Sequence, residues 1–172
     1  PCWVSYPEMV KLSDGVPVLV KASEKEGFIV TAEKIEAAIT PKTRAIIINT
    51  PSNPTGMIYR EEDLREIARV CVEKDIYVIS DEIYEKLIYD GEKHCSVASF
   101  GDEIKKRTII VNGVSKTFAM TGWRIGYTAS DAAIAKVMSN VQSHATSNPN
   151  SIAQKAALAA LDGPMDTVEA MR

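Results

Sequence analysis

The sequence predicts an α/β fold with three layers, in which helices cover both sides of a mainly parallel sheet. Three short apolar runs, rich in β-branched residues, are expected to be buried strands: Arg44–Thr50, Ile76–Ser80 and Thr108–Val111. A helical pattern from about Glu61 to Lys74 separates the first two. Strands that alternate with helices in this way are typical of layered domains with right-handed crossovers.

Before the first strand, the chain predicts two short helices and one further strand. Pro7–Leu12 is expected to form one or two helical turns. The weak alternation of Val16–Lys21 favours a strand. Thr31 is expected to cap the second helix, which Pro41 ends, since proline cannot continue a helix.

The last third of the chain predicts one strand and three helices. Arg124–Ala129 is expected to be a fourth strand, and it could be antiparallel. Helices are expected over Asp131–His144, Ser151–Leu161 and Met165–Met171. The segment TSNPN, Thr146–Asn150, breaks the first two of these apart.

Composition favours a soluble cytoplasmic protein. The 172 residues carry a net charge of −3, with no basic run for nucleic acid and no apolar run of membrane-spanning length. Three cysteines without CxxC spacing fit a reducing compartment, and Cys71 has the pattern of a buried helical thiol. His94 and His144 fit no metal-ligand spacing and no cluster with cysteines or carboxylates, so no metal site is expected.

Polar residues follow each of the three predicted parallel strands. Asn53, Asp81 and Lys116 come just after the first, second and third strand respectively. The carboxyl ends of parallel strands share one edge, where ligands bind in open α/β sheets. We therefore expect these three side chains to converge on one crevice.

Each of these residues also has a simpler interpretation. Pro51–Gly56, PSNPTG, is a rigid turn and could be a plain strand-to-helix loop. Asp81 could cap a helical turn that brings Tyr84 to the same side, or it could pair with a cationic ring nitrogen. Lys116 could cap the sheet edge, whereas a desolvated lysine amine is a nucleophile toward carbonyls.

The segment Thr108–Tyr127 carries a longer pattern, S-K-x-x-x-x-x-G-x-R-x-G. Its matching residues are Ser115, Lys116, Gly122, Arg124 and Gly126. Together with the intact NPTG and D-E-x-Y motifs, this pattern resembles the pyridoxal-phosphate (PLP) enzymes of the aspartate-aminotransferase fold. The resemblance extends over essentially the whole chain.

The resemblance implies a role for each motif residue. Lys116 forms the Schiff base with the cofactor and then shuttles a proton, and Arg124 holds the cofactor phosphate. Asn53 donates to the ring oxygen and to the substrate carboxylate. Asp81 pairs with the pyridinium nitrogen, and Tyr84 donates to the ring oxygen. Lys116, Asp81 and Tyr84 are thus the expected catalytic residues.

Three further residues are expected at the cofactor. Trp3 has the place of the aromatic residue that stacks on the cofactor ring and borders the substrate in the resembling family. Many members have a hydroxyl residue where this chain has Gly113. Either the Ser115 hydroxyl or the backbone amide of Gly113 is therefore expected to contact the phosphate instead.

The resemblance also suggests the whole protein's activity and assembly. Residues 1–172 are expected to be part of a large PLP-binding domain, with the N-terminal segment and the C-terminal small domain absent, so that this piece alone is inactive. The expected reaction is transfer of the amino group of aspartate to 2-oxoglutarate by a homodimer, with Ser143–Gln154 at its interface. Alternatives are an aromatic or alanine aminotransferase, a PLP-dependent lyase or synthase, and a non-catalytic domain of a transcription regulator.

Overall fold

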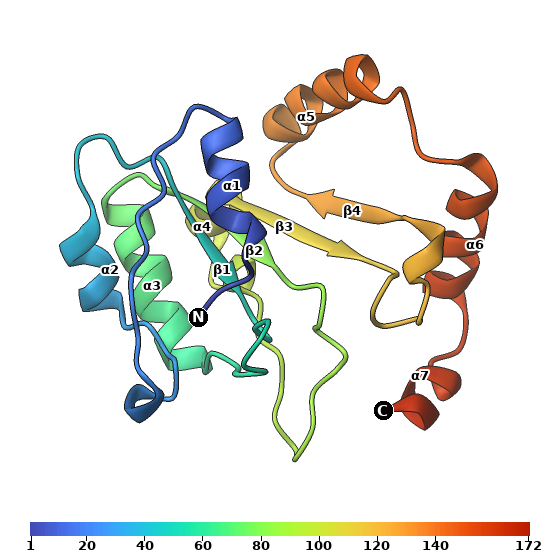
Figure 1. Ribbon diagram of the computed structural model, residues 1–172, viewed down its shortest axis with the longest axis horizontal. Coiled ribbons are helices and arrows are strands. Elements are labelled where there is room, and N and C mark those ends of the chain that lie inside the picture. The colour runs from blue at the N-terminus through green and yellow to red at the C-terminus, as the bar shows by residue number, and fades with distance from the viewer.

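The computed structural model describes residues 1–172 and is organised around a four-stranded mixed sheet (Figure 1). Its strands lie in the order β1 (Ala45–Asn49), β2 (Tyr77–Asp81), β3 (Thr108–Gly113) and β4 (Gly126–Ala129). The first three are parallel, and β4 runs antiparallel to β3. The α/β class and the three parallel strands are as the sequence predicts, and the fourth strand takes the antiparallel direction that the sequence left open.

Seven helices connect and flank the strands. They are α1 (Ser5–Leu12), α2 (Ala32–Ala38), α3 (Glu61–Glu73), α4 (Asp102–Arg107), α5 (Ala132–Ala145), α6 (Ser151–Asp162) and α7 (Asp166–Met171). The Thr31 hydroxyl accepts from the amide of Lys34 and so caps α2 as predicted. The last three helices begin and end within one residue of their predicted bounds. None of the helices combines the length and the apolar character needed to cross a membrane.

The predicted strand at Val16–Lys21 is wrong. These residues belong to no helix or strand, and Val16 and Val18 are 86% and 67% exposed. Alternating side chains indicate a strand only where a neighbouring strand can satisfy its backbone, and none lies beside this segment. The edge of the sheet on this side is β1.

The main core lies between the sheet and the helices α2, α3 and α4. The apolar residues of α3 recur at helical spacing, and Leu64, Ile67 and Cys71 are at most 1% exposed. They pack with Ile48 of β1 and Val78 of β2. Cys71 is the buried thiol that the pattern predicts, and loss of solvent raises its pKa to about 11.

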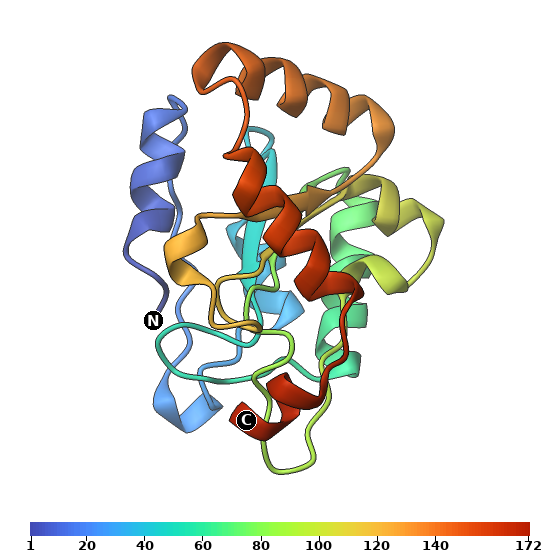
Figure 2. The same cartoon turned by 90° about the vertical axis from the view of Figure 1, so that its right-hand side faces the viewer.

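A smaller core fixes the loop between β3 and β4. Val114 and Ile125, at the two ends of this loop, pack with Ala153 and Ala157 of α6. The amide of Val114 donates to the carbonyl oxygen of Ile125, at 3.3 Å, and closes the loop. Figure 2 shows α6 crossing in front of this region. Because the loop contains Lys116, α6 sets the position of the predicted nucleophile.

Gly113 ends β3 close to the backbone of the segment that enters β4. A Cβ atom at this position would lie 2.8 Å from the carbonyl oxygen of Ile125 and 3.1 Å from Cα of Gly126. Those are backbone atoms, so they can move away only if the strands separate. In this chain, a side chain at position 113 would therefore force the backbone of β3 or of the segment entering β4 to shift.

We expect Gly113→Ala to lower the free energy of unfolding by about 1–3 kcal/mol, as overpacking against backbone does. Gly122→Ala is the matched control, because a Cβ there meets nothing within 4 Å. The control should change stability by less than about 0.5 kcal/mol. Thermal and denaturant unfolding of the two variants measure the difference, and equal stabilities would contradict the steric argument.

Candidate functional site

The carboxyl ends of β1 and β2 lie side by side at one edge of the sheet. Asn49 is in register with Asp81. The amide of Thr50 and the side-chain Nδ2 of Asn49 both donate to the carbonyl oxygen of Asp81, at 3.2 Å and 3.0 Å. The loop that begins at Thr50 therefore starts beside Asp81, as the predicted convergence requires.

The carboxylate of Asp81 is held by two donors from different segments. Its Oδ1 accepts from the amide of Ile83 at 3.2 Å, so Asp81 does cap the turn that follows it. Its Oδ2 accepts from the hydroxyl of Tyr6 at 2.6 Å. Capping and the binding of a cationic ring are compatible, because the carboxylate has more lone pairs than these two bonds use.

Tyr6 is a site residue that the sequence analysis missed. Burial and the hydrogen bond to Asp81 raise the pKa of Tyr6 above its ordinary value, so its hydroxyl stays a donor. The ring of Trp3 packs edge-on against that of Tyr6, with centroids 5.4 Å apart. Tyr6 thus links Trp3, which is 39% exposed, to Asp81. Trp3 and Tyr6 are three positions apart at the start of α1. This spacing was the signal by which the sequence could have indicated their contact.

Lys116 lies next to Tyr84, although the two residues follow different strands. Its Nζ atom is 5.6 Å from the centroid of the Tyr84 ring, which is within cation–π range. Both side chains are half-buried. The loop after β3 and the turn after β2 therefore meet at this amine.

Asn53 presents its side chain from a loop that is fixed by backbone hydrogen bonds. The amide of Gly56 donates to the carbonyl of Ser52 at 2.7 Å, and Gly56 has a φ of 71° that favours glycine. The amide of Asn53 donates to Oδ1 of Asn49 at 2.8 Å. The side-chain amide of Asn53 is half-buried and makes no hydrogen bond within the chain, so it is available to a ligand.

Arg124 is exposed and makes no hydrogen bond or ion pair with the other predicted residues. It has a left-handed backbone with a φ of 55°, which is uncommon for a residue with a side chain. Its guanidinium donates to the carbonyl of Thr121 at 2.8 Å and makes no ion pair. Strained conformations of this kind persist where the surrounding structure imposes them, and they cluster at binding sites.

The structure distinguishes the two candidate phosphate contacts. The amide of Gly113 already donates to Oδ1 of Asn112 at 2.7 Å, so a phosphate could use it only by displacing that side chain. The Ser115 hydroxyl is half-buried and has no partner within the chain. The geometry therefore favours the Ser115 hydroxyl over the Gly113 amide as the phosphate contact. The absence of a side chain at Gly113 has a separate explanation, the close approach of Ile125 and Gly126.

A family model described as "Aminotransferase class I and II" matches residues 1–172. The chain belongs to this family. It is 54% identical to an aspartate aminotransferase of Bacillus sp. (strain YM-2) and 48% identical to an asparagine–oxo-acid transaminase of Streptococcus mutans. Each match covers 100% of this chain and 44% of the relative.

Solved structures of aminotransferases share the fold. The aspartate aminotransferase of Rhizobium meliloti superposes with a TM-score of 0.95 at 45% identity, over 98% of this chain and 42% of that one. An aromatic aminotransferase from Pyrococcus horikoshii gives the same TM-score and identity, over 99% and 46%. The chain spans less than half the length of the curated relatives cited here.

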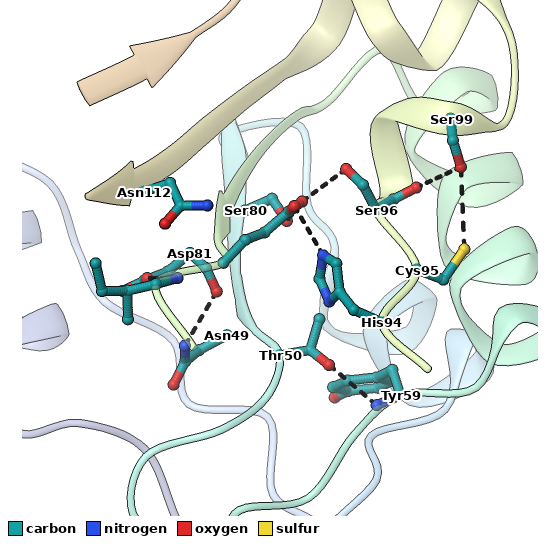
Figure 3. A network of polar contacts seen from close by, with 12 residues as sticks. Asn49, Thr50, Tyr59, Ser80, Asp81, His94, Cys95, Ser96, Ser99 and Asn112 are labelled. Carbon is teal, nitrogen blue, oxygen red and sulfur yellow. Dashed lines mark hydrogen bonds and ion pairs between the residues drawn. The ribbon is translucent and has the colours of Figure 1, made fainter. Parts of the chain in front are cut away.

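This member of the family also has a buried polar network around Glu82, the residue that follows Asp81 (Figure 3). Glu82 is 3% exposed, and its carboxylate accepts from the hydroxyls of Ser80 and Ser96 at 2.9 Å and 2.7 Å. His94 Nε2 lies 2.9 Å from its other oxygen. Burial alone would raise the pKa of Glu82, but the hydrogen bonds from His94, Ser96 and Ser80 outweigh it and hold that pKa below its usual value.

The expectation that the histidines have no carboxylate neighbours is wrong for His94. Possible ligand atoms of Glu82, Glu85 and His94 lie within 4.8 Å of one another. The cluster could not be predicted from the sequence, because the spacing between His94 and the two glutamates matches no known motif. A loop brings His94 back to the end of β2. Both oxygens of Glu82 already accept hydrogen bonds, so the arrangement is that of a carboxylate surrounded by donors.

We expect Glu82→Gln to reduce the acid sensitivity of the protein. A folded-state pKa below the unfolded value means that ionised Glu82 stabilises the fold at neutral pH. That contribution is lost as the pH falls below about 4.3 and through the folded-state pKa. Melting temperatures measured from neutral pH downward should therefore fall more steeply for the wild type than for Glu82→Gln. Glu62→Gln, at an exposed position, should follow the wild type, and parallel curves for all three would refute the assignment.

Proposed function

We propose that the intact protein is a PLP-dependent aminotransferase that transfers the amino group of aspartate to 2-oxoglutarate. The observation that carries the proposal is the meeting of Lys116 with Tyr84 near the sheet edge where Asp81 and the Asn53 loop lie. Relatives that are 54% and 56% identical are named aspartate aminotransferase. In this proposal residues 1–172 are part of the large PLP-binding domain, and the rest of the protein completes the site.

The chemistry of the available groups fits this cofactor. Lys116 offers an amine for an aldehyde, and Asp81 offers a carboxylate for a cationic ring nitrogen. Tyr84 and Asn53 offer donors for a ring oxygen. The remaining group, the phosphate dianion, suits the guanidinium of Arg124 and the free hydroxyl of Ser115.

When bound, PLP supplies an electron sink that makes the Cα proton of an amino acid acidic. The protein's part is to orient the groups and to move the proton. Asp81, fixed by Tyr6 and by the amide of Ile83, would hold the ring nitrogen and favour its protonated form. Lys116, half-buried beside Tyr84, would accept the Cα proton at Nζ and give it up again during the transfer.

Trp3 and Asn53 are proposed to border the substrate. Trp3 is braced by Tyr6 but leaves part of its ring exposed, which suits a stacking surface. The free side-chain amide of Asn53 can donate to a carboxylate. An aromatic amino donor is the second candidate, favoured by the close superposition on the aromatic aminotransferase of Pyrococcus horikoshii.

We also propose that the intact protein is a homodimer whose interface includes Ser143–Gln154. Helix α5 has no buried residue, and Figure 1 shows it standing away from the sheet. Val137 and Val141, one helical turn apart, are 63% and 64% exposed, and Ile152 of α6 is 72% exposed. Apolar side chains at helical spacing need a covering surface, and a two-fold symmetric contact between copies provides one.

Lys116→Ala should abolish the covalent attachment of PLP and lower turnover by at least about 10²–10⁴-fold, because nucleophile and proton carrier are lost together. The visible absorbance of the bound cofactor, borohydride trapping and aspartate turnover of the intact protein measure this. Lys105→Ala, at an exposed position on α4, is the control and should behave as the wild type. Trappable cofactor in Lys116→Ala would exclude the assignment.

Ile152→Asp should weaken dimerisation by tenfold or more, because a charge would be buried without a partner at the interface. Sedimentation velocity at micromolar concentration compares it with the wild type and with Lys105→Glu, which lies on α4 and should remain dimeric. A wild type that is monomeric at this concentration and fully active would overturn the shared interface.

A further inference from the structure

Asn49 joins the two loops that the proposed function assigns to the cofactor. It is the last residue of β1 and is half-buried. Its Nδ2 donates to the carbonyl of Asp81 at 3.0 Å, and its Oδ1 accepts from the amide of Asn53 at 2.8 Å. Figure 3 shows the first of these bonds. The donor and the acceptor of one side-chain amide are thus both hydrogen-bonded, to Asp81, 32 positions away, and to Asn53, 4 positions away.

We propose that Asn49 is a positioning residue that sets the distance between Asn53 and Asp81. The proposal rests on the proposed function, in which Asp81 would contact the ring nitrogen and Asn53 the ring oxygen of one cofactor. A rigid ring tolerates little change in that distance, since errors of about 1 Å in a catalytic arrangement cost up to about a hundredfold in rate. A single side chain that contacts both residues can hold the distance fixed.

The backbone alone does not fix this distance. The ladder between β1 and β2 ends at the pair Asn49 and Asp81, followed by the bond from Thr50 to Asp81. Beyond that point the loop bonds to itself, because the backbone amide of Ser52 donates to the carbonyl oxygen of Met57 at 2.9 Å. The bond from the amide of Asn53 to Asn49 is the only hydrogen bond of that amide or of the Asn53 side chain, and it ties this part of the loop to the sheet.

The residue type matters as much as the position. An amide carries a donor and an acceptor on one planar group, which matches a carbonyl on one side and an N–H on the other. Aspartate would still accept from Asn53 but would turn a carboxylate oxygen toward the carbonyl of Asp81. Asn49→Asp therefore removes one half of the clamp, and Asn49→Ala removes both.

Asp81 itself is constrained from several directions, so a shift of its backbone affects its carboxylate. Its carbonyl oxygen accepts from Asn49 and Thr50, while its carboxylate accepts from Tyr6 and Ile83. Loss of the Asn49 bond leaves the carboxylate tied to a less firmly held backbone. The expected consequence is weaker pairing with the ring nitrogen, rather than loss of the fold.

The experiment compares the intact wild-type protein with Asn49→Ala, Asn49→Asp and the control Thr50→Val. Thr50 is 2% exposed, and its hydroxyl accepts from the amide of Tyr59 at 3.1 Å. The control therefore loses one buried hydrogen bond in the neighbouring residue but keeps the clamp. The readouts are the dissociation constant for PLP, kcat and KM for aspartate, the melting temperature and the amide hydrogen exchange of Asn53 in the cofactor-free protein.

Asn49→Ala should speed exchange of the Asn53 amide, weaken PLP binding by about tenfold to a hundredfold, and lower kcat more than it raises KM. Asn49→Asp should keep the Asn53 amide protected yet still weaken PLP binding. Thr50→Val should lower the melting temperature with PLP affinity and kcat unchanged. In an Asn53→Ala background, Asn49→Ala should cost less than it does alone, because the side chain that Asn49 is proposed to position is already absent.

Two results would overturn the proposal while leaving the proposed function standing. One is faster exchange of Asn53 in Asn49→Ala with wild-type PLP affinity and kcat. The other is equal loss of PLP affinity in Thr50→Val and Asn49→Ala, which would mean that both act through stability alone. A wild type that binds no PLP would instead defeat the proposed function and the role of Asn49 with it, and the exchange measurement would still show whether the clamp exists.

Discussion

The parallel pairing of β1, β2 and β3 is the constraint on which the rest of this structure depends. It places Asn49, Asp81 and Val111 in one row at the carboxyl edge of the sheet. Three segments that are far apart in the sequence therefore begin their loops from the same line. Without that register, neither the Asn53 loop nor the Lys116 loop would start beside Asp81.

At the end of β2 the side chains of the neighbouring acids Asp81 and Glu82 point to opposite sides and have different partners. Asp81 receives the Tyr6 hydroxyl and the Asn49 amide, while Glu82 receives donors from Ser80, Ser96 and His94. Successive side chains of an extended segment point to opposite sides. The Asp81 carboxylate therefore remains accessible to a ligand. The buried network around Glu82 anchors the turn that follows Asp81.

The loop of Lys116 depends on a second layer of packing. Val114 and Ile125 close the loop and rest on two alanines of α6, whose small side chains allow close approach. This contact links the loop of Lys116 to α6, which together with α5 exposes the apolar residues of the proposed dimer interface.

Much of the fold and the motif residues could be predicted from the sequence by itself. Apolar runs marked β1, β2 and β3, helical periodicity marked α3, α5 and α6, and position after a strand selected Asn53, Asp81 and Lys116. These features depend on local patterns, because burial on one face imposes a fixed period on the chain. For Gly113 the sequence indicated a departure from the family pattern, whereas its steric necessity emerged only with β4 in place.

The supporting contacts were decided by tertiary structure alone. Tyr6 reaches Asp81 across 75 positions, Asn49 reaches it across 32, and His94 reaches Glu82 across 12. A hydrogen bond between residues so far apart leaves no periodic trace, because it requires only that two polar groups meet. The same reason explains the wrong strand at Val16–Lys21, since a strand needs a neighbour that its own residues do not specify. The sequence determined which groups could do chemistry, and the packing of distant segments determined which residues hold them in place.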